Sequence, residues 1–455
     1  MPDIVTIEAW RRITEIVESQ DRQKLTDYLD TLAPAELARA LGKLDDQTRT
    51  GVLILLEPED AADIIEELHE SQGADLLEEL PAGKAAAILD EIDSDQRVDI
   101  MHELDKIDLE AILKEMNPEE AEDARALLGY EKTTAGGLMI TEYLAYRENL
   151  TIDDVLSDLR ANAEKYSDYA VQYVYVISET GVLDGVVRLR DLVLSPGYTP
   201  LSAIAILNPF KVKDTDSLHS LAQFFSRNVF FGVPVVDSDG KLVGVVQRAD
   251  VQKASSEAAM NTFQRFAGII GGDELRSMPV KLRSSRRLAF LSVNIVLNLI
   301  SASVIAMYED TLQAVIALAV FLPILSDMSG CSGNQAVAVS IRELSLGLAQ
   351  PRDFLRVWWK EAQVGVINGI VLGAMLCGVA YIWKGSIVLA AVVGLALAAN
   401  TLLSVCLGGL IPLTIQRVGI DPALAASPIL TTFTDMLGFF LALSFAAICL
   451  SSGWL

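Results

Sequence analysis

Histidine and cysteine are scarce in this chain of 455 residues, and their positions exclude several kinds of site. The histidines lie in polar segments with a helical pattern and the cysteines lie in apolar segments: His69, His102 and His219, and Cys331, Cys377, Cys406 and Cys449. Cysteines in such segments are typical of small core residues, not of a disulfide framework or a zinc site. The sequence also has no Walker loop, G-x-S-x-G motif or metalloprotease motif. This argues against an enzyme and against an ATP-driven pump.

Basic residues are outnumbered by acidic ones, 36 to 61, which gives a net charge of −25. Residues 1–287 carry −23 of this charge, and the residues from Leu288 onward carry −2. An acidic front half disfavours nucleic acid as a partner and suits cations, although acidic residues also serve plain solubility. The N-terminus lacks the basic start and apolar run of a signal peptide. We therefore expect the front half to stay in the cytoplasm.

Residues 5–128 have a repetitive helical pattern. The stretches "LAPAELARALGKL", "LEPEDAADIIEEL", "LPAGKAAAILDEI" and "MNPEEAEDARALL" each place a proline near the first turn of a helix. Pro34, Pro58 and Pro81 are 24 and 23 residues apart, and Pro118 comes later. Leu, Ile and Ala recur at helical spacing, with acids on the other faces. We expect a short solenoid of stacked helix pairs.

A β-rich pattern begins near Gly136. The runs "VQYVYVI" (171–177) and "LDGVVRL" (183–189) flank a turn at Glu179–Gly181. "FFGVPVVDSDGKLVGVVQRADV" (230–251) repeats the plan of strand, turn, strand and helix. A helical pattern precedes each strand pair. The sequence therefore predicts two tandem α/β modules, followed by a long helix from about Asp250 toward "RSSRRLAFL".

Five apolar segments follow, at about 286–308, 311–341, 357–383, 385–415 and 422–450. Each can cross about 30 Å of hydrocarbon at about 1.5 Å per residue. Basic residues collect in the loops of one side: Arg283, Arg286, Arg287, Arg342, Arg352, Arg356, Lys360 and Arg417. The opposite loops hold Lys384, Glu309 and Asp310. The positive-inside rule then places the N-terminal domains in the cytoplasm and the C-terminus outside.

Asp435 lies at the centre of the last apolar segment, where a carboxylate is costly and must face a partner or water. No basic residue lies within the five apolar cores, so a passing cation is the remaining counter-charge. Thr431 and Thr432 lie within a turn of Asp435 and are candidate pore-lining residues. The structural alternative is a protonated Asp435 that is hydrogen-bonded between helices.

The second apolar segment contains "PILSDMSGCSGNQAVAVSIREL" (323–344). Gly330 and Gly333 permit a close backbone approach or a break in the helix. Asn334 and Gln335 place amide groups at membrane depth. Such groups either join helices or line a path, and the sequence leaves both interpretations open.

These motifs together resemble the MgtE family of magnesium channels. "LLGYEKTTAGGLM", two modules similar to cystathionine-β-synthase (CBS) domains, "LPILSDMSGCSGNQAVAVSIREL" and "GIDPALAASPILTTFTDMLG" occur in the family's order over essentially the whole chain. The resemblance implies a magnesium channel or transporter of the cytoplasmic membrane. It also implies a homodimer with its pore on the dimer axis, where the acid that matches Asp435 binds hydrated Mg²⁺. A symmetric dimer would bring two such carboxylates to one level.

The implied fold is an α-helical membrane protein with five transmembrane helices, a cytoplasmic helical-repeat N domain and α/β tandem CBS domains. The expected divisions are an N domain at 1–130, tandem CBS domains at 131–252, a connecting plug helix at 253–285 and a pore domain at 286–455. In the family, cytoplasmic acids hold Mg²⁺ and close the pore. The candidates for that role here are Asp250, Glu257, Asp216, Glu59 and Asp90.

The chain departs from the family pattern at three places. Cys331 stands where the glycine motif usually carries Asn, and the plug stretch "RADVQKASSEAAMNTF" keeps chiefly Asp250 and Glu257 of the family's acids. We therefore expect weakened gating by cytosolic Mg²⁺. Arg188 and Gln247 stand where nucleotide-binding CBS modules often have Thr or Ser, so nucleotide binding is doubtful.

Two alternatives stay open from the sequence. The first is a transporter for another divalent cation, such as Mn²⁺ or Co²⁺, because these ions are similar in size to Mg²⁺. The second is a membrane-anchored cation sensor whose helices only dimerise, but such a sensor needs neither Asp435 at mid-membrane nor a five-helix core.

Overall fold

The computed structural model divides the chain into two compact units, Met1–Glu257 and Ala258–Leu455. The structure describes residues 3–163, 166, 169, 172–271, 274, 276, 278 and 280–454.

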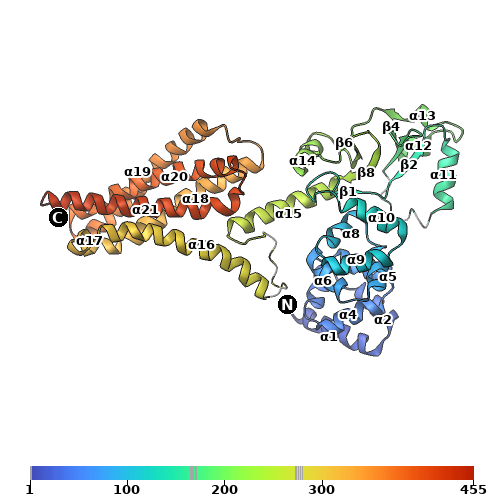
Figure 1. Cartoon of the computed structure of the whole chain (residues 1–455), viewed down its shortest axis with the longest axis horizontal. Coiled ribbons are helices and arrows are strands. Elements are labelled where there is room, and N and C mark those ends of the chain that lie inside the picture. The colour runs from blue at the N-terminus through green and yellow to red at the C-terminus, as the bar shows by residue number, and fades with distance from the viewer. Residues whose placement is uncertain are drawn as a thin grey trace. The chain divides into compact units, whose positions relative to one another are not determined.

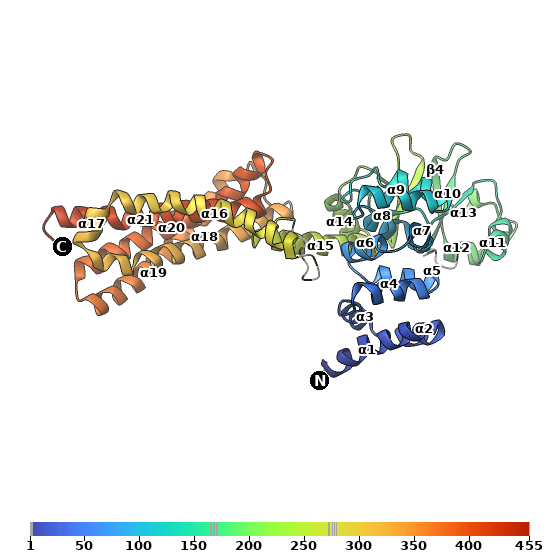
Figure 2. The ribbon, with the colours of Figure 1, turned by 60° about the horizontal axis from the view of Figure 1, so that its bottom comes forward.

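The first unit begins with a stack of short helices, shown in blue to cyan in Figures 1 and 2. Their bounds are α1 (Asp3–Ser19), α2 (Arg22–Leu29), α3 (Pro34–Leu41), α4 (Asp46–Leu55), α5 (Pro58–Glu66), α6 (Glu70–Glu78), α7 (Ala82–Leu89), α8 (Ser94–Met101), α9 (Lys106–Glu115) and α10 (Pro118–Leu127). Alternate helices pack on one another: α5 contacts α7, α7 contacts α9, and α6 contacts α8. The predicted helical repeat is confirmed, and prolines begin α3, α5 and α10 as the pattern indicated.

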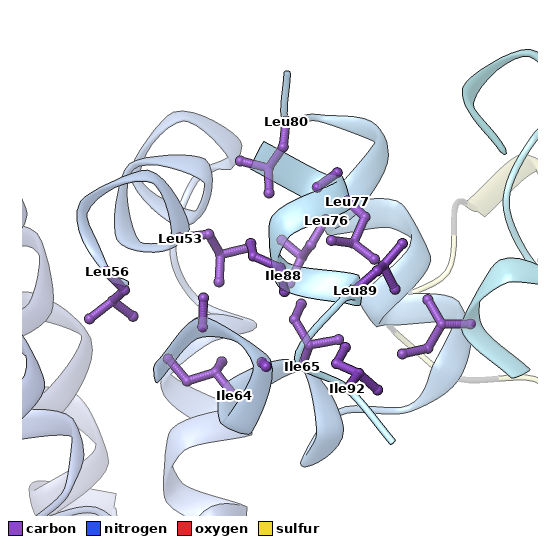
Figure 3. Close-up of a cluster of buried hydrophobic side chains, with 14 of the residues drawn as sticks. Leu53, Leu56, Ile64, Ile65, Leu76, Leu77, Leu80, Ile88, Leu89 and Ile92 are labelled. Atoms are coloured by element: carbon purple, nitrogen blue, oxygen red, sulfur yellow. The ribbon is translucent and has the colours of Figure 1, made fainter. Parts of the chain in front are cut away.

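The core of this stack is aliphatic. Figure 3 shows Leu53, Ile65, Leu77, Ile88 and Leu89 pointing toward one another between α4, α5, α6 and α7. Each of these side chains is at most 1% exposed. Burying one such side chain fully contributes about 1.5–3 kcal/mol to stability. The positions of the leucines and isoleucines therefore determine which helix faces pack together.

Two four-stranded sheets follow, with strand orders β2-β3-β4-β5 and β1-β8-β7-β6. The strands are β1 (Met139–Ile140), β2 (Leu144–Arg147), β3 (Tyr173–Ile177), β4 (Leu183–Arg188), β5 (Ile206–Leu207), β6 (Val212–Lys213), β7 (Gly232–Val236) and β8 (Leu242–Gln247). The helices among them are α11 (Ile152–Ala161), α12 (Leu189–Leu194), α13 (Leu201–Ile204) and α14 (Leu218–Arg227). In both sheets the central hairpin is antiparallel and a parallel strand flanks it. The two predicted α/β modules are therefore present.

The long helix predicted after the second module is two helices. α15 spans Arg248–Phe266, and α16 spans Val280–Met307. Gly268 and Gly271 follow α15 with φ of 87° and 103°, a left-handed conformation that ends a helix and favours glycine. The prediction treated this stretch as continuous because it gave these glycines no weight. The first predicted apolar segment begins within α16, which itself begins at Val280.

The second unit is built on helices long enough to cross a membrane, and five such spans lie within the described residues, as predicted. They are α16, Ile316–Ser345 (a short 3₁₀ turn followed by α18, Leu322–Ser345), α19 (Phe354–Lys384), α20 (Ile387–Arg417) and α21 (Pro422–Ser451). The short helix α17 (Glu309–Ala314) joins the first two. α20 packs against α18, α19 and α21, and α18 also packs against α21. Figures 1 and 2 both show these helices side by side.

The outer faces of this unit are apolar. Ile367, Ile370 and Val371 of α19 and Val296 and Leu299 of α16 are each more than half exposed. An exposed aliphatic surface of this kind suits contact with lipid, since hydrocarbon chains are as apolar as these side chains.

Candidate functional site

Asp435 lies near the middle of α21 and is 8% exposed. Its carboxylate accepts a hydrogen bond from the Ser326 hydroxyl of α18, with an Oγ–Oδ1 distance of 2.5 Å. No lysine or arginine forms an ion pair with it among the described residues. A carboxylate at the centre of a membrane helix costs ~2.5–3.5 kcal/mol on insertion scales. One hydroxyl donor is a small compensation for a charge at that depth.

The threonines beside Asp435 direct their hydroxyl protons to their own helix. Thr431 donates to the Ser427 carbonyl at 3.0 Å, and Thr432 donates to the Pro428 carbonyl at 2.8 Å. Their oxygen lone pairs remain available as acceptors. Both residues stay candidates for lining a path, but neither hydroxyl proton is free to donate to a permeating ion's water.

The glycine motif of α18 lies against the other helices, and the helix runs through it without a break. A Cβ on Gly333 would lie 2.3 Å from Ser404 Oγ of α20, so this glycine permits a close helix crossing. A Cβ on Gly330 would lie 3.9 Å from Thr434 Oγ1 of α21. Of the two predicted uses of these glycines, close approach is confirmed for Gly333 and a helix break is wrong.

Asn334 and Gln335 differ in their surroundings. Asn334 is half-buried, and its Oδ1 atom has no hydrogen-bond partner within the described part of the chain. Gln335 is exposed on the surface of α18. An unpaired amide oxygen inside an apolar helix bundle is unfavourable unless water or an ion reaches it.

Sequence reasoning missed a set of buried polar groups on α20. The Asn400 amide donates to the Thr434 carbonyl at 3.0 Å, and the Ser404 hydroxyl donates to the Ser329 carbonyl at 2.5 Å. Asn400 and Ser404 are fully buried, and the apolar segment around them reads "LALAANTLLSVC". These bonds join α20 to the two helices that carry Ser326 and Asp435. The sequence already indicated these groups, because they are polar residues within an apolar segment.

Asp327 was missed as well. It follows Ser326 on α18 and is exposed on the surface of the second unit. Its carboxylate accepts a weak hydrogen bond from the thiol of Cys331, with an Sγ–Oδ1 distance of 4.0 Å. The same criterion that identified Asp435, an acid inside an apolar span, applies to Asp327.

A second candidate region is an acidic group in the first unit, where α8 and α15 come together. Burial, followed by the charge of Asp250, raises the pKa of Asp95 to about 8. Burial raises the pKa of Asp250 to about 6, and the charge of Asp93 adds to this rise. Asp250 Oδ2 has no hydrogen-bond partner among the described residues. Carboxylates that lie close together repel one another, which raises their pKa values, and a bound cation relieves this repulsion.

Lys132 is a built-in cation at the edge of this group. Its Nζ atom lies 3.1 Å from Glu70 Oε2, 3.2 Å from Glu103 Oε1 and 3.7 Å from Asp99 Oδ1. Burial, and then the charge of Glu70, raises the pKa of Asp99 to about 7, while the charge of Lys132 opposes the rise. The charge of Glu257 also reaches Asp99 and raises its pKa. The structure thus brings Glu257 and Asp250 toward the acids of α8.

Arg97 forms a second internal cation centre. Its side chain is 1% exposed and lies 2.6 Å from Glu120, 3.7 Å from Asp123 and 3.9 Å from Glu142. These partners come from α10 and from the segment between β1 and β2. Arg97 therefore ties the helical stack to the first strands that follow it.

The structure gives only local contacts for two other predicted regulatory acids, Asp216 and Glu59. Asp216 accepts a hydrogen bond from the Lys213 backbone N–H at 2.9 Å, within a turn. Glu59 is exposed in the first turn of α5. No hydrogen bond or ion pair among the described residues joins Glu59 or Asp216 to Asp250 or Glu257.

Asp90 belongs to a pattern of acids that connect successive repeats. Three carboxylates accept from the backbone N–H of an N-cap residue 27 positions later: Glu66 from Asp93 (3.3 Å), Glu78 from Asp105 (2.7 Å) and Asp90 from Asn117 (3.1 Å). Such bonds satisfy donors that a helix start leaves open. Part of the acidity of the front half therefore has a structural purpose.

Three protein families match the sequence. Residues 32–133 match the MgtE intracellular N domain, residues 201–257 match the CBS domain, and residues 322–445 match MgtE, described as a divalent cation transporter. The chain is 33% identical over 456 residues to the magnesium transporter MgtE of Thermus thermophilus. The match covers 97% of this chain and 98% of the relative. The magnesium transporter MgtE of Bacillus subtilis is 28% identical, with 91% of this chain and 92% of the relative covered.

Two solved structures are similar to the front half. The soluble part of a magnesium transporter is 28% identical with a TM-score of 0.50, and the match covers 56% of this chain and 99% of that chain. The cytosolic domain of the Mg²⁺ channel MgtE in complex with ATP is 30% identical with a TM-score of 0.49, and the match covers 53% of this chain and 98% of that chain. The ATP belongs to that solved domain, whereas the expectation for this chain rested on Arg188 and Gln247.

Proposed function

We propose that this chain, which belongs to the MgtE family of magnesium transporters, carries Mg²⁺ across a membrane along a path lined by α18 and α21. The observation that carries the proposal is Asp435, a buried carboxylate at mid-span with a hydroxyl partner and no ion pair among the described residues. Mg²⁺ sheds its water reluctantly and is usually held through few carboxylates. A carboxylate beside hydroxyl and amide groups suits such a hydrated ion.

The working assembly is a homodimer with the path on its two-fold axis. One Asp435 supplies a single negative charge, whereas a divalent ion is balanced by two. A symmetric pair of chains brings two copies of the same residue to one level without any new element. Thr431, Thr432, Asn334 and Gln335 would then line the path above and below that level.

The direction of insertion follows from the charged loops. Arg283, Arg286 and Arg287 precede the first long helix, and Arg417 follows the fourth. The positive-inside rule places these residues in the cytoplasm together with the first unit. Five spans then leave the C-terminus on the outer side.

Cytosolic Mg²⁺ closes this channel only weakly. The acids near α15 that would bind it are Asp95, Asp99, Asp250 and Glu257. Support comes from the fixed cations beside them: Lys132 contacts Asp99 directly, and the charge of Lys253 lowers the pKa of Asp250. Carboxylates that already have ammonium partners gain less from a divalent ion, and a ligand shifts an equilibrium only by its differential affinity.

Flux into liposomes tests the transport proposal. The full chain is reconstituted, and uptake of Mg²⁺, Mn²⁺ and Co²⁺ is measured with membrane potential and pH varied separately. We expect Mg²⁺ uptake that follows the potential, and empty liposomes serve as the control. Uptake no faster than in empty liposomes would refute transport, and uptake of Mn²⁺ or Co²⁺ without Mg²⁺ would favour the other divalent cations.

Protease protection tests the gating proposal. Cleavage within 250–285 is compared in chelator and in millimolar Mg²⁺ for the full chain and for Lys132→Gln. We expect a small Mg²⁺ effect in the natural chain and a larger one in Lys132→Gln, with Lys132→Arg as the matched control. Strong Mg²⁺-dependent protection of the natural chain, with channel closure over the same range, would contradict weak gating.

A further inference from the structure

One face of α18 is polar where the outer faces of the neighbouring helices are apolar. Asp327, Cys331 and Gln335 are all exposed, and their spacing of four residues puts them on one side of the helix. The opposite side, including Leu325 and Val337, is buried within the unit. In contrast, the exposed face of α19 consists of residues such as Ile367 and Ile370.

Asp327 lies at the level of Asp435. Two contacts fix the register between α18 and α21: Ser326 Oγ lies 2.5 Å from Asp435 Oδ1, and a Cβ on Gly330 would lie 3.9 Å from Thr434 Oγ1. Asp327 immediately follows Ser326, so its Cα is displaced by only about 1.5 Å along the helix axis. Each chain thus carries two acids at one depth of the membrane.

A charged group on an exposed helix face at this depth cannot be left against lipid. Asp327 forms no ion pair among the described residues, and its thiol neighbour is a weak donor. The polar face that continues to Gln335 is suited to water. The environment that fits Asp327, Cys331 and Gln335 together is therefore an aqueous path that a cation enters.

We propose that Asp327 is a second carboxylate of the ion path and sets its preference for divalent over monovalent cations. The proposal rests on the proposed transport function and adds a residue to it. With Asp327, each chain presents two negative charges to a hydrated divalent ion at one level. Doubling the charge favours a divalent ion over Na⁺ or K⁺, because the Coulomb energy scales with the product of the charges.

The first test measures transport by reconstituted full chains that carry Asp327→Asn or Asp327→Glu. We expect Asp327→Asn to retain Mg²⁺ uptake, to raise the Mg²⁺ concentration for half-maximal uptake about tenfold, equivalent to about 1.4 kcal/mol, and to increase Na⁺ leak. Asp327→Glu should restore most of the preference, because it keeps the charge. Unchanged affinity and leak in Asp327→Asn would overturn the proposal.

The second test does not depend on flux. Cys331 lies one turn from Asp327, so chains that keep Cys331 and have the other three cysteines replaced by alanine report on this face. A charged, membrane-impermeant methanethiosulfonate reagent should label Cys331, Mg²⁺ should slow the labelling, and Asp327→Asn should remove the Mg²⁺ effect. A chain that keeps only Cys377 of α19 is the matched control and should stay unlabelled.

The outcomes separate this proposal from the transport proposal. Cys331 labelling that Mg²⁺ slows through Asp327 supports the residue's role even in a preparation without flux. Flux of Mg²⁺ with Cys331 inaccessible, or with labelling that Mg²⁺ does not affect, would leave the transport function standing and would refute the role of Asp327.

Discussion

Carboxylates are used in opposite ways at the internal cation centres of the first unit and in the membrane-type helices of the second unit. In the first unit, Arg97 and Lys132 each lie within 4 Å of three acidic side chains. In the second unit, Asp435 has a hydroxyl partner and Asp327 a thiol neighbour, and neither forms an ion pair among the described residues. An acid with a built-in cation holds elements together, whereas an acid without one leaves its charge for a mobile ion.

The comparison predicts opposite responses to the loss of a charge. Removing one partner of a buried ion pair leaves the other uncompensated and is strongly destabilising. Removing a buried acid that has no cation relieves a desolvation cost instead. The loss of a charge should therefore lower stability at the cation centres of the first unit. In the second unit it should lower transport and leave stability unchanged or higher.

The largest expected effect is at Asp435. Asp435→Asn should abolish Mg²⁺ uptake, because it removes the buried charge that balances the ion, while the melting temperature of the full chain stays equal or rises. Uptake into liposomes and a thermal melt in detergent measure the two quantities.

Asp353→Asn is a matched control for this change. Asp353 lies in the loop before α19 and accepts a hydrogen bond from the Gln350 backbone N–H, which asparagine can also accept. This variant should transport normally. If Asp435→Asn transported as well as Asp353→Asn, the proposed path would be in the wrong place.

The next effect in size is at Arg97. Arg97→Met should lower the free energy of unfolding of the first unit by about 3–5 kcal/mol, because Glu120, Asp123 and Glu142 lose their shared cation. Hydrogen–deuterium exchange of the full chain at α8 and α10 measures the loss.

Arg147→Met is the control for Arg97, since Arg147 is exposed at the end of β2. Surface changes of this kind usually stay within about 0.5 kcal/mol. Equal exchange in the two variants would mean that the buried cation centre adds nothing to stability, and the contrast between the two units would fail.

Local patterns in the sequence were enough to predict most of the architecture. Proline at helix starts and aliphatic spacing identified the helical stack, and apolar length identified five spans. The break after Phe266 was missed although Gly268 and Gly271 were visible, because a glycine in an otherwise helical pattern is not decisive alone.

The candidate site was only partly predictable, because its pairings are long-range. Asp435 was identified from its depth, but its partner Ser326 is 109 residues away in the chain. Lys132 and Glu70 are 62 residues apart, and no local pattern connects them. Asp327 could have been found from depth alone, and the sequence reading passed over it.

A smaller effect is expected from pH, through Asp95. Burial raises the pKa of Asp95 from its ordinary value of 3.8 to about 8, so the folded state binds this proton more tightly than the unfolded chain does. The free energy of unfolding is then highest below the pKa that Asp95 has in the unfolded chain. It decreases as the pH rises toward the pKa of Asp95 in the folded state, by at most about 1.4 kcal/mol per pH unit. The melting temperature of the first unit should therefore decrease as the pH rises from about 6 to about 7.5.

Asp95→Asn should flatten this pH dependence, because it removes the titrating group and keeps the shape. Mg²⁺ should raise the melting temperature of the natural chain more at the higher pH, where Asp95 and Asp250 are more often ionised together. A slope that is unchanged in Asp95→Asn would assign the pH dependence to another group.

The smallest effect is expected for acids in a solvated loop outside the apolar spans. Glu309 and Asp310 are exposed in the first turn of α17, in the loop that we place on the outer side. Acids in bulk solvent raise the local cation concentration but do not select among ions, and salt screens them beyond about 10 Å at about 0.1 M. Neutralising both should lower Mg²⁺ flux modestly at low ionic strength and hardly at all at high salt. A loss of Mg²⁺-over-Ca²⁺ discrimination in this variant would mean that an acid in a solvated loop can select, and that a position within an apolar span is not what separates a selective acid from a solvated one.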